Sequence, residues 1–239
     1  PAPWLNRKIE RANSLIGEWL EKTDSKVYCS ISGGKDSLVV CHLIYRIFPG
    51  CPFVWVNQGP LAEWADCIEL LETLKSQGWN ILELCPVRSL LKLYRDYGIP
   101  LDGTMATGLD KKINTALIYN PLDEYQELNS IHGYAWGLRK ESKGRSLYLK
   151  SKGELYRKKD GLWVCSPVGF WSTQDIWAYI DREELPYAAI YDRDRMNTRN
   201  GPPIGTTGVN WGRLSELRHH HPDLFAQFIA EFPEVANYA

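Results

Sequence analysis

The chain has 239 residues, of which 44% are apolar and 12% aromatic, and its formal net charge is −1 at pH 7. This near-neutral charge excludes a uniformly basic nucleic-acid binder, although it allows a local basic face. The sequence shows no signal-peptide pattern and no apolar run of the roughly 18–20 residues that cross a membrane, so we expect a cytoplasmic protein with no membrane partner. A chain of this length can bury one substantial core, so we expect a single domain over residues 1–239.

Helical and extended patterns alternate over residues 4–84. The apolar residues recur either at the helical period or in short runs bounded by turn residues. The pattern predicts, in order, a helix over 4–22, a strand over 26–31, a helix over 38–48, a strand over 52–56, a helix over 63–77 and a strand over 80–84. Such alternation predicts an α/β fold with a doubly wound, mainly parallel sheet flanked by helices. In these sheets ligands bind beyond the carboxyl ends of the strands.

The later part of the chain is less regular. It predicts, in order, short helices over 90–97 and 111–120, a strand over 131–136, hairpin strands over 147–149 and 155–157, a further extended segment over 162–165 after a turn at 159–161, a helix from the capping residue Ser172 and a helix over 211–232. We therefore expect a small basic β-hairpin insertion at about 146–165 and a loop-plus-helix extension at about 193–239.

A loop rich in glycine and serine joins the first predicted strand to the helix that follows it. Its residues are Ser32, Gly33, Gly34, Lys35, Asp36 and Ser37. A strand that passes through such a turn into a helix presents backbone N–H groups and the positive end of the helix dipole to an anion. The glycines allow close approach, Lys35 adds a charge and the serines add hydroxyl groups. Asp36 either caps the helix or holds a Mg²⁺ ion that accompanies phosphates.

Two familiar phosphate-binding motifs do not fit this loop. A Walker A motif would need a glycine at Cys29 and a serine or threonine at Asp36. A dinucleotide-binding G-x-G-x-x-G sequence after a strand is also missing. The loop therefore predicts a phosphate or nucleotide site of another kind.

The loop resembles the PP-loop of the ATP pyrophosphatases and the sulfonucleotide (PAPS and APS) reductases. Two later stretches resemble the PAPS-reductase branch: residues 137–142 (GLRKES) followed by Arg145, and residues 167–177 (PVGFWSTQDIW) leading to 185–187 (LPY). The resemblance covers roughly residues 25–192 and implies the adenine nucleotide α-hydrolase-like fold. It also implies that the ligand is an adenine nucleotide, either ATP accompanied by Mg²⁺ or a sulfonucleotide.

The resemblance assigns roles to residues at three strand ends. It implies catalytic roles for Lys35, Asp36, Arg139 and Arg145, and nucleotide or phosphate contacts for residues 32–37, Gly137, Arg139 and Lys140. Glu141 could orient one of the arginines. Asn57 stands where the family often has an acid, so we expect its amide, with Gln58 and Gly59, to meet a ribose or a base edge.

The cysteines bear on the choice of reaction. Sulfonucleotide reductases resemble this chain but attack sulfur with a cysteine in a Glu-Cys-Gly-Leu-His segment, and this sequence has no cysteine after Cys165. Reduction would then need a thiol from Cys165 or from a partner protein. The cysteines include no C-x-x-C pair, so we expect no iron–sulfur cluster. The favoured hypothesis is that the protein cleaves ATP to AMP and pyrophosphate and thereby activates an acceptor for sulfur incorporation, such as the DNA backbone. A sulfonucleotide reductase and a non-catalytic nucleotide sensor are the alternatives.

Residues 139–160 carry nine lysines and arginines against three acids. Such a segment is either a solvated hairpin face or a surface for nucleic-acid phosphates. PAPS-reductase-like proteins without the reductive cysteine resemble the ATP pyrophosphatase components of DNA phosphorothioation systems. That resemblance implies DNA as a partner of the basic hairpin and a cysteine desulfurase or iron–sulfur protein as a sulfur-transfer partner. His219, His220 and His221 are consecutive, so they cannot converge on a metal from a helix.

Overall fold

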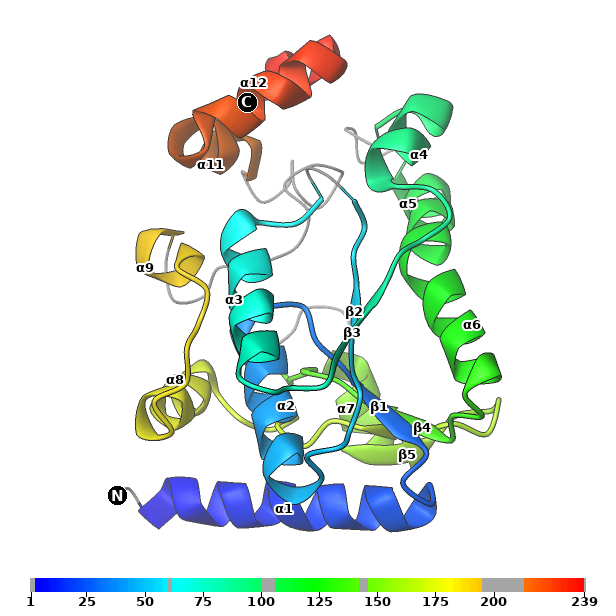
Figure 1. Cartoon of the computed structure of the whole chain (residues 1–239), viewed down its shortest axis with the longest axis vertical. Helices are drawn as coiled ribbons and strands as arrows, with labels where there is room; N and C mark the ends of the chain where they lie inside the picture. Colours follow the sequence, from blue (N-terminus) through cyan, green and yellow to red (C-terminus); the bar gives the residue numbers. More distant parts are fainter. Residues whose placement is uncertain (1–2, 60–61, 100–105, 142–145, 195–212, 239) are drawn as a thin grey trace. The chain divides into compact units, whose positions relative to one another are not determined.

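The computed structural model describes residues 3–59, 62–99, 106–141, 146–194 and 213–238. Within these ranges the strands form one six-stranded sheet in the order β3-β2-β1-β4-β6-β5 (Figure 1). The strands are β1 (Val27–Ser30), β2 (Phe53–Val56), β3 (Ile81–Leu84), β4 (Gly133–Ala135), β5 (Leu155–Arg157) and β6 (Trp163–Cys165). The pairs β1–β2, β1–β4 and β4–β6 are parallel, and β5 is antiparallel to β6. The predicted α/β class with a doubly wound, mainly parallel sheet is confirmed.

Helices precede, connect and follow the strands. They are α1 (Pro3–Lys22), α2 (Lys35–Ile47), α3 (Ala65–Ser76), α4 (Leu90–Tyr97), α5 (Ala106–Asn114), the π-helix η1 (Thr115–Tyr119), α6 (Asn120–Leu128), α7 (Ser146–Lys152), α8 (Thr173–Arg182), α9 (Ile190–Asp194), α11 (Arg213–His220), α12 (Pro222–Glu231) and the 3₁₀-helix η2 (Pro233–Tyr238). Among the described residues, no helix has the length and apolar character needed to span a membrane.

Neighbouring residues of β1 point to opposite faces of the sheet, as a strand requires. On one face the Cys29 Sγ lies 3.3 Å from the Cys41 Sγ of α2, and α2 also packs against α1 and α8. On the other face the Tyr28 ring meets Tyr125 edge-on, and Gln126 of the same helix, α6, donates a hydrogen bond of 2.9 Å to the Tyr28 hydroxyl. Helices therefore cover both faces at β1.

The order of the strands creates a switch point beside β1. The chain passes from β1 to β2 and β3 on one side, whereas β4 pairs with the other side of β1. In open α/β sheets the crevice for a ligand forms where the direction reverses, beyond the carboxyl ends of those strands. The loop after β1 and the segment after β4 both begin at this edge.

The chain divides into two compact units. The first comprises Pro1–Trp55, Asp66–Glu83 and Glu124–Tyr191, and the second comprises Val56–Ala65, Leu84–Asp123 and Asp192–Ala239. The first unit holds the loop at 32–37 and the segment that follows β4. The second holds Asn57, Gln58 and Gly59. The single domain expected over residues 1–239 stays a prediction.

The start of the hairpin insertion differs from its prediction. Residues 147–149 were expected in a strand but lie in α7, where Leu149 is buried and the Ser151 hydroxyl donates to the Leu147 carbonyl. A short Leu-Tyr-Leu run fits either structure, and here burial of Leu149 at helical spacing decides. The hairpin itself consists of β5 and β6, with the predicted turn near Gly161 at a φ of 95°.

The carboxyl-terminal helix also differs from its prediction. The helix expected over 211–232 is interrupted at His221, and Pro222 starts α12. Proline has no N–H for the preceding helix, so it suits the first position of a new one. Most of the loop expected at 193–208 lies outside the described residues.

Candidate nucleotide-binding site

The loop between β1 and α2 depends on glycine at one position for two reasons. Gly33 has a φ of 69°, and a Cβ there would lie 2.7 Å from the Cys67 Cβ of α3. A side chain would therefore be strained by the backbone conformation and would collide with α3. Gly34 is the N-cap of α2 and has no side chain with which to cap it. The first turn of α2 therefore keeps backbone N–H groups for other acceptors.

The two serines of the loop bond to each other and to the backbone. The Ser37 hydroxyl donates to the Gly34 carbonyl over 2.9 Å and lies 3.2 Å from the Ser32 hydroxyl. The Ser32 N–H also donates to the Ser37 hydroxyl over 3.2 Å. These bonds hold the loop in a closed turn, so the serines shape the loop in addition to the ligand contacts predicted for them.

Lys35 is buried at the first position of α2. Its ammonium lies 3.5 Å from Asp36 Oδ1 and 5.4 Å from the centre of the Tyr191 ring. Its backbone N–H donates a 2.9 Å hydrogen bond to the Tyr191 hydroxyl. Tyr191 belongs to α9, far along the chain, and lies outside the sequence motifs that predicted the site. The motif 185–187, just before α9, was the available signal.

Gly137 brings the segment after β4 against the loop. A Cβ at this position would lie 2.7 Å from the Ser37 nitrogen and 2.8 Å from the Asp36 carbonyl carbon. Both neighbours are backbone atoms of α2, which cannot move aside as a flexible side chain could. The first residue of the GLRKES motif must therefore be glycine for β4 to end beside the loop. The two motifs meet at one sheet edge, as the sequence predicted.

The Arg139 guanidinium is buried and contacts protein groups on several sides. Its Nε lies 3.1 Å from Asp36 Oδ1 in an ion pair without hydrogen-bond alignment. Its terminal nitrogens donate to Glu141 over 2.7 Å, to the Trp171 carbonyl over 3.2 Å and to the Thr173 hydroxyl over 3.2 Å. Arg139 thus links the start of α2 to the start of α8. A direct ligand contact for Arg139 stays a prediction.

Glu141 supports that linkage from outside. Its carboxylate accepts hydrogen bonds from the Thr173 N–H over 3.1 Å and from the Thr173 hydroxyl over 2.9 Å, besides the bond from Arg139. Partial burial opposes ionisation, but the bonds from Arg139 and Thr173 lower the pKa of Glu141 below its ordinary value. The prediction that Glu141 orients an arginine agrees with these contacts.

The other two basic residues of this motif play different parts. The Lys140 side chain is exposed, and its backbone N–H donates to the Gly169 carbonyl over 2.8 Å, which ties the motif to residues 167–171. Arg145 lies outside the described residues, so its predicted catalytic role stays a prediction.

Residues 57–59, in the second unit, form a turn after β2. The Gly59 N–H donates to Asn57 Oδ1 over 3.0 Å, and Gly59 has a φ of 98°. The Gln58 side chain donates to Glu63 over 3.0 Å, and burial raises the pKa of Glu63 to about 8. Glu63 lies outside the sequence motifs described above. Contact of Asn57, Gln58 and Gly59 with a nucleotide stays a prediction.

Comparison with known proteins identifies the family. The family model for the phosphoadenosine phosphosulfate reductase domain matches residues 26–205. The chain belongs to this family. A phosphoadenosine 5'-phosphosulfate reductase of Xanthomonas oryzae pv. oryzae strain PXO99A is 26% identical over 198 residues, which cover 79% of this chain and 76% of the relative.

Solved structures show the same fold at low identity. The Candida auris phosphoadenylyl-sulfate reductase in a phosphate complex has a TM-score of 0.58 and 14% identity, and the match covers 81% of this chain and 92% of that chain. The Candida glabrata FMN adenylyltransferase in complex with ATP has a TM-score of 0.54 and 14% identity, and the match covers 79% of this chain and 58% of that chain. Together with the sheet order, these matches place the family domain in the adenine nucleotide α-hydrolase-like fold.

Five of the six cysteines are buried. Cys165 is fully buried in β6, and desolvation raises its pKa well above the ordinary value. A thiol rather than a thiolate is a poor nucleophile. Cys29, Cys41, Cys51 and Cys67 are also buried, whereas Cys85 in the second unit is exposed. Cys165 therefore does not fit the role of attacking thiol.

The described residues do not form a metal site of their own. They contain no group of three or more histidine, cysteine, aspartate or glutamate side chains placed to hold a metal ion. Asp36, the residue predicted to hold Mg²⁺, has Oδ1 next to Arg139 and Lys35. Both cations compete with a metal ion for that oxygen. A Mg²⁺ ion at Asp36 stays a prediction.

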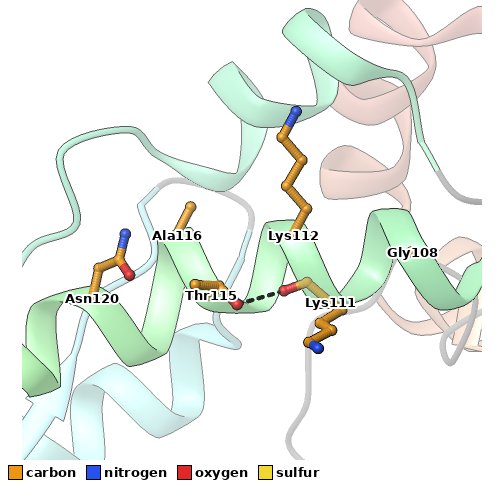
Figure 2. Close-up of a pocket in the computed structure, with 6 residues that line it drawn as sticks. All are labelled: Gly108, Lys111, Lys112, Thr115, Ala116 and Asn120. Atoms are coloured by element: carbon orange, nitrogen blue, oxygen red, sulfur yellow. Dashed lines mark hydrogen bonds between the residues drawn. The ribbon is translucent and has the colours of Figure 1, made fainter.

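A pocket of about 380 Å³ lies on the second unit, along α5, η1 and the start of α6 (Figure 2). Its lining consists of Gly108, Lys111, Lys112, Thr115, Ala116 and Asn120. Lys112 extends toward α4, where its ammonium lies 3.7 Å from the centre of the Tyr97 ring. Among the described residues, none of the predicted site residues lines this pocket.

Proposed function

We propose that this chain is an ATP pyrophosphatase that cleaves ATP between the α and β phosphates. The carrying observation is the start of α2, where backbone N–H groups, the buried Lys35 ammonium and the close approach of Gly137 meet at the switch point of the sheet. Such a helix start binds phosphate oxygens through the amides and the helix dipole. A lysine beside it neutralises further negative charge.

In the proposed reaction an acceptor oxygen attacks the α-phosphorus. The bond between that phosphorus and the bridging oxygen to the β-phosphate breaks, and pyrophosphate leaves with the electron pair. With water as acceptor the products are AMP and pyrophosphate, and with another acceptor AMP is transferred to it. The start of α2 and Lys35 would hold the pyrophosphate and stabilise the charge that grows on it.

Arg139 would act as a positioning residue in this scheme. Its ion pair with Asp36 fixes the first turn of α2, and its bonds to Trp171 and Thr173 fix that turn against the start of α8. Lys35 must be positioned to within about 1 Å to neutralise the leaving group, and such a rigid support gives it that precision.

The test is direct. We expect AMP and pyrophosphate in equal amounts when the protein is incubated with ATP and Mg²⁺, and a loss of at least tenfold in rate for Lys35→Ala. Lys75→Ala, which removes an exposed lysine from α3, is the matched control and should keep the wild-type rate. No AMP from the wild-type protein would overturn the proposal.

A sulfonucleotide reductase is the second candidate, and the names of the relatives favour it. The buried position of Cys165 argues against it, because the attack on sulfur would need a thiolate from elsewhere. Release of sulfite from PAPS or APS with thioredoxin would establish this reaction instead. Tight ATP binding without either product would favour a nucleotide-sensing subunit.

For the acceptor we propose the DNA backbone, bound at the β5–β6 hairpin. The exposed cations there are Arg157 and Lys159 of the hairpin and Lys150 and Lys152 of α7, the helix that precedes it. Next to them, Tyr156 of β5 and Tyr134 of β4 share one face of the sheet, because both stand level with Val164 of β6. Lysines attract backbone phosphates without regard to sequence, and partly exposed tyrosine rings can stack on bases. A sulfur-transfer partner, such as a cysteine desulfurase or an iron–sulfur protein, would complete this function.

A further inference from the structure

The hydroxyl of Tyr191 occupies the position at which an anion would meet the first N–H of α2. The Lys35 N–H donates to it over 2.9 Å, and both residues are buried, at 5% exposure for Lys35 and 4% for Tyr191. The ring of Tyr191 also lies under the Lys35 ammonium, 5.4 Å from its nitrogen. One tyrosine therefore contacts the backbone and the side chain of the same loop lysine.

This contact competes with the expected ligand chemistry. The N–H groups at the start of a helix are the groups that bind phosphate oxygens. A neutral phenol oxygen makes a weaker acceptor than a charged phosphate oxygen. The cation above the aromatic ring is likewise held less strongly than it would be by a phosphate dianion. A phosphate can therefore replace the tyrosine at both contacts.

We propose that Tyr191 is a gate residue, whose hydroxyl competes with a pyrophosphate oxygen for the Lys35 N–H and leaves it when the anion binds. The inference rests on the proposed function for its choice of pyrophosphate as ligand. It assigns a role to a residue outside the three family motifs. Tyr191 thereby sets the affinity of the loop without taking part in bond making.

Displacement of the Tyr191 hydroxyl would affect the aromatic side chains that pack around its ring. Its ring packs edge-on against Trp177 of α8 at 5.4 Å, and Trp177 packs edge-on against Tyr187 at 5.1 Å. Tyr191 is also the last residue of the first compact unit, and the chain continues into the second unit at Asp192. Movement of the hydroxyl away from Lys35 would change the packing of Trp177.

The experiment compares two matched hydroxyl deletions, with inorganic pyrophosphate as the probe and isothermal titration calorimetry as the measurement. Tyr191→Phe removes the competing oxygen and keeps the ring, so we expect pyrophosphate to bind about threefold to tenfold more tightly, the equivalent of one neutral hydrogen bond. Tyr187→Phe keeps the same aromatic neighbour and should bind as the wild type does. Unchanged or weaker binding by Tyr191→Phe would overturn the inference, because a purely structural role predicts weaker binding.

A second measurement needs no change at Tyr191. Pyrophosphate should alter the tryptophan emission of the wild-type protein, and Trp177→Phe should abolish most of that change. An emission change that persists in full in Trp177→Phe would contradict the displacement of Tyr191. Melting temperatures of the variants identify any that fail to fold, and the wild-type emission still tests the gate in that case.

The gate and the proposed reaction can fail separately. If Tyr191→Phe binds pyrophosphate more tightly but ATP yields no AMP, the result supports the gate and contradicts the pyrophosphatase activity. If ATP yields AMP but the wild-type protein and Tyr191→Phe bind pyrophosphate equally tightly, the result contradicts only the gate. If the wild-type protein binds no pyrophosphate, the gate falls whatever the AMP assay gives.

Discussion

Gly137 stands so close to Ser37 that a Cβ on the glycine would lie 2.7 Å from the serine nitrogen. The carboxyl end of β4 and the first turn of α2 are therefore in backbone contact. Gly137→Ala should force them apart, cost about 1–3 kcal/mol of unfolding free energy and weaken pyrophosphate binding at least tenfold. Urea unfolding and calorimetry measure the two effects.

Gly17→Ala is the control for that substitution. Nothing lies within 4 Å of a Cβ at Gly17 in α1, so alanine there should stabilise the protein by up to about 1 kcal/mol through helix propensity. Equal effects of the two alanines would show that crowding at Gly137 does not matter.

Arg139→Lys separates a positioning role from ligand contact. Lysine keeps the charge but cannot bond Glu141, Trp171 and Thr173 together, so we expect a loss of about 3 kcal/mol in unfolding free energy. A double-mutant cycle with Thr173→Val should give a coupling of about 0.5–3 kcal/mol. If Arg139→Lys instead keeps full stability and loses only nucleotide affinity, the arginine is a ligand contact.

Glu63 should make stability depend on pH. Burial raises its pKa in the folded protein from 4.5 to about 8, so the folded state binds more protons than the unfolded state between those values. Stability should fall as pH rises through this window, by at most about 1.4 kcal/mol per pH unit. Glu63→Gln should flatten that part of the curve in urea unfolding. Glu69→Gln changes an exposed carboxylate of α3 and should leave it as in the wild type.

Thiol accessibility tests the argument against a reductase. Of the six cysteines, Cys85 is exposed and the other five are buried. A thiol-specific chromogenic reagent should therefore label one thiol per chain rapidly at pH 8 and the rest only in urea. Cys85→Ser should remove the rapid phase. Rapid labelling that Cys165→Ala abolishes would return Cys165 to consideration as a nucleophile.

The basic hairpin predicts a salt-dependent interaction with DNA. Each phosphate contact that is removed should reduce the slope of log affinity against log salt by about 1. Lys150→Ala, Lys152→Ala and Lys159→Ala should each lower affinity for DNA of any sequence, as measured by fluorescence anisotropy. Lys75→Ala on α3 should not. Binding of wild-type protein that does not vary with salt would contradict phosphate contacts at this hairpin.

The sheet and its loop could be predicted from the sequence because their signals are local. The alternation of helices and strands and the glycines beside Lys35 lie within short windows, and the structure has both where they were expected. The motif 185–187 lies close to Tyr191, but the contact of Tyr191 with Lys35 could not be predicted, because it joins residues far apart in the sequence and depends on how α9 returns to the loop. Arg139 was identified, but its burial depends on Glu141 and Thr173 converging around it. A three-residue pattern such as that of 147–149 cannot distinguish a strand from a helix. Here the segment is helical because that conformation buries Leu149.

The Arg139 guanidinium joins side chains or carbonyls from all three family motifs: Asp36 in the loop, Glu141 in its own motif, and Trp171 and Thr173 in the third. One planar group contacts all of these partners at once. A substitution in one motif alone would therefore leave a buried charge or a buried hydrogen-bond donor without its partner. In an alignment of relatives, positions 36, 139, 141 and 173 should vary together or not at all. When the loop is transplanted into another protein of this fold, that protein should fold stably only if Arg139, Glu141 and Thr173 are transplanted with the loop.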